Sequence, residues 1–237
     1  MIDVIQVSKR FGKMEVLHDI NLQCNQGECI ALIGPNGCGK TTLIKSILGM
    51  VLPDRGDILF NQTSIKNDYL YRKNIGYMPQ IGRYPENMTI GQVISMIEKI
   101  RGTQNISLDT DLQIQFNIQQ LLDKRMSTLS GGTTQKISAI LAFLFNPSVL
   151  ILDEPTAGLD PISSEILKEK IITEKQKGKL ILITSHLLSE LDQLVTQLIY
   201  MQDGSVIFHK DISILQNETG EEKISKAITH FLKQQNN

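Results

Sequence analysis

A glycine-rich segment at residues 34–42 carries the strongest chemical signal in the sequence. It reads GPNGCGKTT and matches the pattern G-x-x-x-x-G-K-[ST] in full. Such a loop curves its backbone N–H groups into a concave site for phosphate, and the helix that follows adds positive potential. Lys40 is expected to reach the β- and γ-phosphates of a nucleotide, and Thr41 to offer its hydroxyl to Mg²⁺. The predicted phosphate-binding residues are Gly34, Pro35, Asn36, Gly37, Cys38, Gly39, Lys40, Thr41 and Thr42.

Two adjacent acids, Asp153 and Glu154, follow the apolar run VLIL at residues 149–152. Carboxylates at the carboxyl end of a buried strand lie where open α/β sheets bind ligands. Asp153 is expected to hold Mg²⁺ through water, and Glu154 to act as the general base that takes a proton from an attacking water. Pro155 comes next, which predicts an extended backbone at Glu154.

Short apolar runs alternate with helical periodicity along the chain, which is typical of an α/β fold. Two of these runs, VLIL at 149–152 and LILIT at 180–184, are apolar throughout. They predict strands of a parallel sheet that are covered on both faces. The predicted strands are Cys29–Ile33, Ile58–Phe60, Ile75–Met78, Val149–Leu152, Leu180–Thr184, Leu198–Met201 and Val206–Phe208.

Two predicted helices follow directly from the motifs. One runs from Thr41 to about Gly49, so the phosphate loop has a strand before it and a helix after it, unlike an ordinary glycine-rich turn. The other has Asp160 as N-cap, Pro161 in its first turn and Gly178 after its end. This second helix would connect the two buried strands as a right-handed crossover.

Helical patterns replace strand patterns between the two halves of the predicted sheet. Residues 88–145 are expected to form a helical subdomain, with a helix that starts at Thr89 and a possible capping box to Gln92. A helical tail is expected at about 221–234, with one apolar stripe. The chain is otherwise expected to be a single domain spanning residues 1–237.

Composition narrows the classes of protein. The formal net charge is −1, which argues against a nucleic-acid partner. The longest uncharged apolar stretch, residues 137–152, is interrupted by Asn146-Pro147 and is shorter than the roughly 20 residues of a membrane span. The three cysteines, Cys24, Cys29 and Cys38, fit neither a disulfide framework nor a zinc site. A cytoplasmic protein without a secretory signal is expected.

Further motifs stand in a fixed order along the chain. Gln80 closes the run IGYMPQ, Leu129-Ser130-Gly131-Gly132 precedes a helical pattern from Thr133 to about Phe145, Gly158-Leu159-Asp160 follows the acids, and His186 follows LILIT. Together with the phosphate loop, they resemble the ATP-binding subunit of ABC transporters over nearly the whole chain. The resemblance implies a P-loop NTPase core with a mostly parallel sheet, an antiparallel β subdomain and an inserted α-helical subdomain.

The resemblance also implies roles for these residues. Gln80 would contact Mg²⁺ and the attacking water, and His186 the γ-phosphate, although a polar strand end and a capping or surface histidine are the plainer alternatives. Phe11 would stack on adenine unless it packs in the core. Ser130, Gly131 and Gly132 would contact ATP held by a second subunit, with Asp160 crossing the same interface. Because one chain cannot easily point two helix N-termini at one nucleotide, two chains are expected to enclose two ATP molecules.

The segment from Leu129 to Lys136, here called the signature segment, departs from the family pattern at two positions. Thr133 stands where a glutamine is usual, and Lys136 where an arginine is common. Threonine is too short to reach a ribose hydroxyl, and lysine lacks the bidentate geometry of arginine. These departures predict an ATP-bound dimer that is held less tightly than is usual in the family. Thr133→Gln should therefore change the affinity for ATP or its turnover.

The expected role is that of an ATPase peripheral to the cytoplasmic membrane face, coupled to a transmembrane permease subunit. Tyr84 and Met88 are expected to contact that partner. A soluble iron–sulfur assembly ATPase of the same family is the alternative. DNA-repair relatives would carry long coiled-coil insertions, which this chain lacks, and translation-factor relatives would carry tandem ATPase units. Residues 77–94 resemble ATPases of copper-processing exporters linked to nitrous-oxide reductase maturation.

Overall fold

The six-stranded sheet of the computed structural model is the centre of the molecule. The structure describes residues 1–102, 107–186, 188, 191 and 194–235. The strand order is β10-β9-β3-β8-β7-β6, and only the β9–β10 pair is antiparallel. The strand predictions are therefore confirmed with small changes at their ends. The bounds are β3 (Cys29–Ile33), β6 (Ile75–Met78), β7 (Val149–Asp153), β8 (Leu180–Thr184), β9 (Gln197–Gln202) and β10 (Ser205–Asp211).

The two faces of this sheet belong to two separate hydrophobic clusters. Alternate residues of β3 show the division: Cys29, Ala31 and Ile33 face one cluster, and Ile30 and Leu32 face the other. All five are at most 4% exposed, as expected for a strand covered on both sides. Helix α1 (Lys40–Ile47) covers one face, and α5 (Pro161–Gln176), the crossover between β7 and β8, covers the other.

A second sheet packs against the α1 side and is entirely antiparallel, in the order β2-β1-β4-β5. This confirms the antiparallel β subdomain that the family resemblance implies. Only its segment Ile58–Phe60 stands among the predicted strands, because the long strands mix exposed polar residues with buried ones and contain register shifts. The bounds are β1 (Ile2–Phe11), β2 (Met14–Cys24), β4 (Arg55–Phe60) and β5 (Thr63–Ser64).

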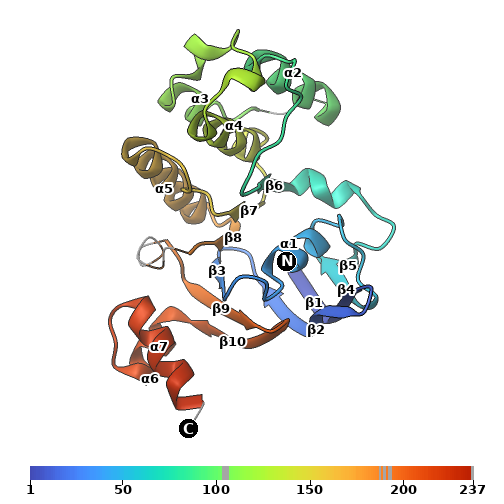
Figure 1. The fold of residues 1–237 in the computed structure, drawn as a ribbon, viewed down its shortest axis with the longest axis vertical. Helices are drawn as coiled ribbons and strands as arrows, with labels where there is room; N and C mark the ends of the chain where they lie inside the picture. Colours follow the sequence, from blue (N-terminus) through green and yellow to red (C-terminus); the bar gives the residue numbers. More distant parts are fainter. Residues whose placement is uncertain (103–106, 187, 189–190, 192–193, 236–237) are drawn as a thin grey trace.

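The chain between β6 and β7 is helical and forms the upper part of the molecule in Figure 1. The predicted capping box is confirmed, since Thr89 Oγ1 accepts from the Gln92 backbone and the Gln92 side chain accepts from the Thr89 N–H. Helix α4 begins at Gly131, earlier than predicted, because Ser130 is its N-cap. The bounds are α2 (Ile90–Arg101), α3 (Asp111–Gln115), α4 (Gly131–Phe143), and short 3₁₀ turns at Ile118–Leu121 and Met126–Thr128. Another 3₁₀ turn, Leu70–Asn74, precedes β6.

The C-terminal segment forms two helices rather than one. Helix α6 (Ile212–Thr219) was not predicted, and α7 (Ile224–Gln235) carries the predicted apolar stripe. Both helices pack beside β10 (Figure 1), where the ring of Phe231 lies edge-on to that of Phe208 with centroids 4.8 Å apart. Within the described residues, we find no helix with the length and apolar character needed to span a membrane.

Candidate nucleotide site

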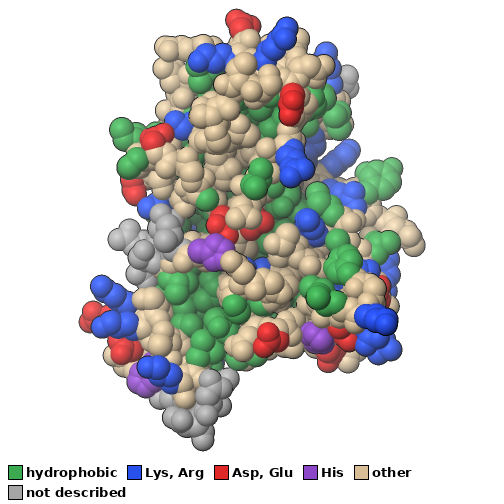
Figure 2. Space-filling model, viewed as in Figure 1, with side chains coloured by type: hydrophobic (Ala, Val, Ile, Leu, Met, Phe, Trp, Pro, Cys, Tyr) green, Lys and Arg blue, Asp and Glu red, His purple; other side chains and the backbone are tan. Residues whose placement is uncertain are grey.

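A polar cavity of about 480 Å³ opens at the carboxyl edge of the six-stranded sheet. Figure 2 shows acidic and histidine side chains next to one another near the middle of this face. The cavity brings together predicted residues that are far apart in the sequence. It also includes Val16 of β2, which belongs to no motif and was not predicted. The lining residues are Val16, Asn36, Gly37, Gly39, Lys40, Thr41, Thr42, Gln80, Asp153, Glu154 and His186.

The phosphate loop joins β3 to α1, and its glycines are required by close backbone contacts. A Cβ on Gly34 would lie 2.0 Å from the Met201 carbonyl oxygen, and one on Gly39 would lie 2.8 Å from that of Val16. Lys40 Nζ donates to the carbonyl oxygens of Gly34 (2.7 Å) and Pro35 (3.1 Å), so the ammonium lies across the loop. Cys38 is only 3% exposed and therefore supports the loop from beneath.

The carboxylates at the end of β7 are tied to the end of β8. Asp153 Oδ1 accepts a hydrogen bond from Thr184 Oγ1 at 2.5 Å, and the Glu154 N–H donates to the backbone and side-chain oxygens of Thr184 at 3.1 and 3.0 Å. Asp153 is 7% exposed, whereas Glu154 reaches the cavity. Parallel pairing of the two strands thus fixes both acids at one edge of the sheet.

The backbone at Glu154 differs from the prediction. Its φ is +50°, in the left-handed region, although the following proline favours an extended conformation. A non-glycine residue held there costs about 1–3 kcal/mol, and surrounding structure must maintain it. The hydrogen bonds to Thr184 and a contact from Gln135 Nε2 to the Glu154 carbonyl oxygen at 3.4 Å fix the peptide groups around Glu154. These tertiary bonds override the local preference.

His186 contacts the predicted general base directly. Its Nε2 lies 2.7 Å from Glu154 Oε1, and the two side chains are 48% and 17% exposed. An ionised carboxylate only accepts hydrogen bonds, so this contact places the proton on Nε2. The histidine therefore orients the carboxylate and still faces the cavity, an arrangement that a plain surface histidine would not show.

Of the two residues Gln80 and Phe11, both predicted to contact the nucleotide or its metal, only Gln80 is among those that line the cavity. Gln80 lines the cavity next to the carboxylates. Phe11 ends β1 and is 51% exposed, with the Lys9 ammonium 5.5 Å from its ring centroid, so the alternative of core packing is wrong. An exposed ring can still offer its face to a planar base.

The signature segment lies apart from this cavity. Of the residues described, Ser130, Gly131 and Gly132 are not among those that line it. Gly132 instead packs on the loop before α5, where a Cβ would lie 2.7 Å from the Gly158 carbonyl oxygen. The N-termini of α1 and α4 therefore lie in different places of one chain.

Asp160 links α4, the helix that follows Ser130, to α5. It caps α5 by accepting from the Ser163 N–H at 2.9 Å and the Ser163 hydroxyl at 2.7 Å, and it pairs with Lys136 Nζ at 2.9 Å. The bond from Lys136, with those from Ser163, holds the pKa of the Asp160 carboxyl far below its usual range. Lys136, the residue at the arginine position, also lies 5.7 Å from the ring centroid of Phe116.

The cavity suits a magnesium nucleotide better than a protein-only metal site. Within the described part of the chain, no group of three or more histidine, cysteine, aspartate or glutamate residues could hold a metal. The cavity does offer the oxygen donors of Thr41, Gln80 and Asp153. Mg²⁺ prefers oxygen ligands and is commonly bound by one or two carboxylates together with substrate phosphates. The donor set therefore fits Mg²⁺.

Comparison with known proteins places the chain in one family. The sequence model described as ABC transporter matches residues 17–157. The ABC transporter ATP-binding protein YtrB of Bacillus subtilis is 30% identical over 92% of this chain and 74% of its own length. The Nod factor export ATP-binding protein I of Bradyrhizobium sp. is 29% identical over 92% of this chain and 72% of its own length.

Solved structures agree with this placement. The structure of an ATP-binding subunit of an ABC transporter superposes with a TM-score of 0.88 at 26% identity, covering 97% of this chain and 98% of the other. A dimeric ATP-binding cassette in a post-hydrolysis state with ADP and Pi bound has a TM-score of 0.80 at 20% identity over 90% of this chain and 99% of its own, a similarity of fold. The chain belongs to the ABC transporter family, as one of its ATP-binding subunits.

Proposed function

We propose that this chain hydrolyses ATP as the energy-supplying subunit of an ABC transporter, with two chains closing on two ATP molecules. The proposal rests on the separation between the nucleotide cavity and the N-terminus of α4. The phosphate loop, Asp153, Glu154 and His186 share one cavity, whereas the helix N-terminus at Ser130 lies outside it. A second chain supplies the missing contacts if the two associate head to tail.

Hydrolysis in such a site depends mainly on positioning and electrostatics. The phosphate loop and Lys40 hold the β- and γ-phosphates. Thr41, Gln80 and Asp153 would hold Mg²⁺, which neutralises charge on the phosphates when bound. Glu154 accepts the proton of the attacking water, and His186 keeps the Glu154 carboxylate in place through the 2.7 Å contact.

The second chain completes the site. Ser130, Gly131 and Gly132 of one chain contact the γ-phosphate held by the other, and Asp160 lies at the same interface. Phe11 offers its exposed ring to adenine. Loss of the γ-phosphate after hydrolysis removes the contact between the chains, so the dimer opens and the membrane subunit returns to its resting state.

A groove on the helical part is proposed to receive a short helix of the membrane subunit on the cytoplasmic face. One cavity, of about 550 Å³, includes Tyr84 and Met126, and a second, of about 710 Å³, includes Met88, Met96 and the 73% exposed Ile100. The second cavity, with Met88, Met96 and Ile100, suits the apolar face of a partner helix, and the first, with Arg83 and Glu86, suits its polar side chains. The Tyr84 hydroxyl also contacts Ser138 Oγ of α4 at 2.9 Å, so a helix bound there would adjoin α4.

Tyr84→Ala tests the membrane partner. It should abolish ATP-driven transport while the isolated protein still hydrolyses ATP, and Tyr84→Phe, which loses only the hydroxyl bond to Ser138, should retain transport. Unchanged transport in a folded Tyr84→Ala protein would contradict this part of the proposal. Co-purification with solubilised membranes separates a transporter subunit from the alternative of a soluble iron–sulfur assembly ATPase. The copper-exporter resemblance stays a prediction, which copper accumulation in a deletion strain would test.

Lys40→Ala tests the nucleotide site itself. Because the ammonium is the cation that reaches the phosphates from the loop, its removal should weaken binding of ATP measured by calorimetry. Lys45→Ala on the same helix α1, outside the lining of the cavity, is the matched control and should bind ATP normally. Equal affinity of the Lys40→Ala and wild-type proteins would overturn the assignment of the cavity.

A further inference from the structure

Thr133 contacts Ser130 of its own chain. The presence of threonine where the family usually has glutamine does not by itself suggest this contact. Its hydroxyl lies 2.9 Å from the Ser130 hydroxyl, and its backbone N–H donates to Ser130 Oγ at 3.2 Å. Both groups of Thr133 therefore meet the one serine oxygen that caps helix α4. This contact was not predicted from the sequence, where Thr133 is only a shorter side chain than glutamine.

Either hydroxyl can be the donor in this contact, and the capacity of the Ser130 oxygen allows the Thr133 hydroxyl to donate to it. The oxygen has two acceptor lone pairs and one proton to donate. The Thr133 N–H occupies one lone pair, and the Thr133 hydroxyl, when it donates, occupies the second. The proton of Ser130 is then left to point away from the helix, and Ser130 itself is exposed.

The geometry of threonine makes it suited to hold this arrangement. A threonine in a helix is restricted to two main χ1 rotamers, so placing its hydroxyl against Ser130 costs little entropy. Thr134 holds the same serine at a different atom, since its hydroxyl donates to the Ser130 carbonyl oxygen at 3.1 Å. One threonine thus contacts the serine side chain and the next contacts its backbone.

We infer that Thr133 is a positioning residue: its hydroxyl donates to Ser130 Oγ and so directs the Ser130 proton to the γ-phosphate of ATP bound by the second chain. The inference rests on the proposed function, because it assumes that Ser130 meets that phosphate. It departs from the expectation that threonine at this position only loosens the dimer. Thr133 instead replaces a lost contact with one that acts through the serine.

Four variants test the inference in the purified protein: Thr133→Val, Thr133→Ser, Thr134→Val and Ser130→Ala. Valine keeps the shape of threonine and removes the hydroxyl. Thr133→Val should lower kcat/KM for ATP about fivefold, the effect of one hydrogen bond of ordinary strength. Thr133→Ser retains the hydroxyl and should stay within about twofold of wild type. Thr134→Val, which loses a bond to the carbonyl only, should also stay within about twofold.

The double variant Ser130→Ala/Thr133→Val identifies how Thr133 acts. Thr133→Val should have no further effect on kcat/KM once Ser130 is alanine, because the group that it positions is gone. A loss that adds fully to that of Ser130→Ala, a Thr133→Ser protein as slow as Thr133→Val, or wild-type kinetics in Thr133→Val would each overturn the inference. If Ser130→Ala alone leaves activity unchanged, the proposed two-chain site fails as well, so the two failures are distinguishable.

Discussion

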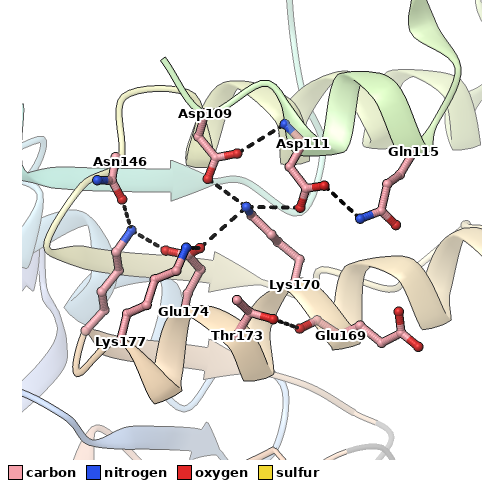
Figure 3. A network of polar contacts seen from close by, with 10 residues as sticks. Asp109, Asp111, Gln115, Asn146, Glu169, Lys170, Thr173, Glu174 and Lys177 are labelled. Atoms are coloured by element: carbon pink, nitrogen blue, oxygen red, sulfur yellow. Dashed lines mark hydrogen bonds and ion pairs between the residues drawn. The ribbon is translucent and has the colours of Figure 1, made fainter. Parts of the chain in front are cut away.

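Two clusters of polar and charged side chains lie at opposite ends of β7 and β8, and they differ in what completes them. The first is the cavity group of Lys40, Asp153, Glu154 and His186. The second, the ion-pair cluster, joins α5 to the segment around α3 and to the loop before β7 (Figure 3). It consists of Asp109, Asp111, Asn146, Lys170, Glu174, Lys177 and Lys179.

The ion-pair cluster is satisfied by its own members. Glu174 is fully buried and pairs with Lys177 at 2.7 Å, with Lys170 at 3.4 Å and with Lys179. Lys170, whose side chain is 4% exposed, also pairs with Asp109 at 2.6 Å and Asp111 at 3.2 Å. Figure 3 shows these side chains converging from α5 and from the helical segment. The cluster therefore fastens the helical part to the core.

The side chains of the cavity group are not paired with one another in this way. Lys40 Nζ donates to main-chain carbonyl oxygens of its own loop, and Glu154 pairs with a half-exposed histidine beside an open cavity. The same residue types thus serve different purposes: buried charges paired with one another hold elements together, and charges that line an open cavity can bind a nucleotide together with its metal ion. Replacing glutamate by glutamine at one place in each cluster should separate the two roles.

The largest effect is expected from Glu154→Gln in the cavity group. Loss of the general base should slow ATP hydrolysis about 10²- to 10⁴-fold, while ATP binding and the free energy of unfolding stay near wild type. Phosphate release and denaturant unfolding measure the two quantities. Hydrolysis at the wild-type rate would remove Glu154 from the role of base.

Glu174→Gln should give the opposite result. Removing one partner of a buried ion-pair group leaves lysines uncompensated and costs about 3–5 kcal/mol of unfolding free energy. The matched control is Glu165→Gln on the same helix, since Glu165 is 67% exposed and its 2.9 Å pair with Lys168 should contribute less than about 1 kcal/mol. Urea unfolding measures both variants. Equal stability of the two variants would show that the cluster does not fasten the helical part.

The smallest effect concerns pH. Burial raises the pKa of the Glu174 carboxyl, but bonds from Lys177 and Lys179 outweigh burial, so its pKa lies below the ordinary value of 4.5. The unfolded chain therefore binds the proton more readily, and the stability that Glu174 contributes is present above pH 4.5 and lost as the pH falls through the folded pKa. The unfolding free energy of wild type should fall more steeply below pH 4.5 than that of Glu174→Gln. Parallel curves in acid would contradict the pairing.

The sequence predicted the cavity group far better than the ion-pair cluster. The phosphate loop and the acids after β7 are recognisable because function requires particular residues at fixed spacing beside strands. The ion-pair cluster pairs residues that are far apart in the sequence, such as Asp109 and Lys170, 61 positions apart, and no local pattern predicts such contacts. The backbone at Glu154 was predicted wrongly for the same reason, because tertiary hydrogen bonds to Thr184 decide it.

Hydrophobic periodicity predicted some strands of the fold and missed others. The parallel strands were predicted because they are buried on both faces and contain few polar residues. Strands β1 and β2 are long, but register shifts interrupt the alternation of their buried and exposed residues, so their pattern was missed. Val16 on β2 was missed with them, although it lines the cavity.

The central claim is that two chains make one ATP site. Molar mass measured by light scattering on Glu154→Gln at saturating ATP and Mg²⁺ tests it most directly, with Glu154→Gln/Ser130→Ala as the companion variant. The account predicts a dimer for the first protein and a monomer for the second. A Glu154→Gln protein that binds ATP yet remains a monomer, beside a wild-type protein that hydrolyses ATP at full rate as a single chain, would contradict it.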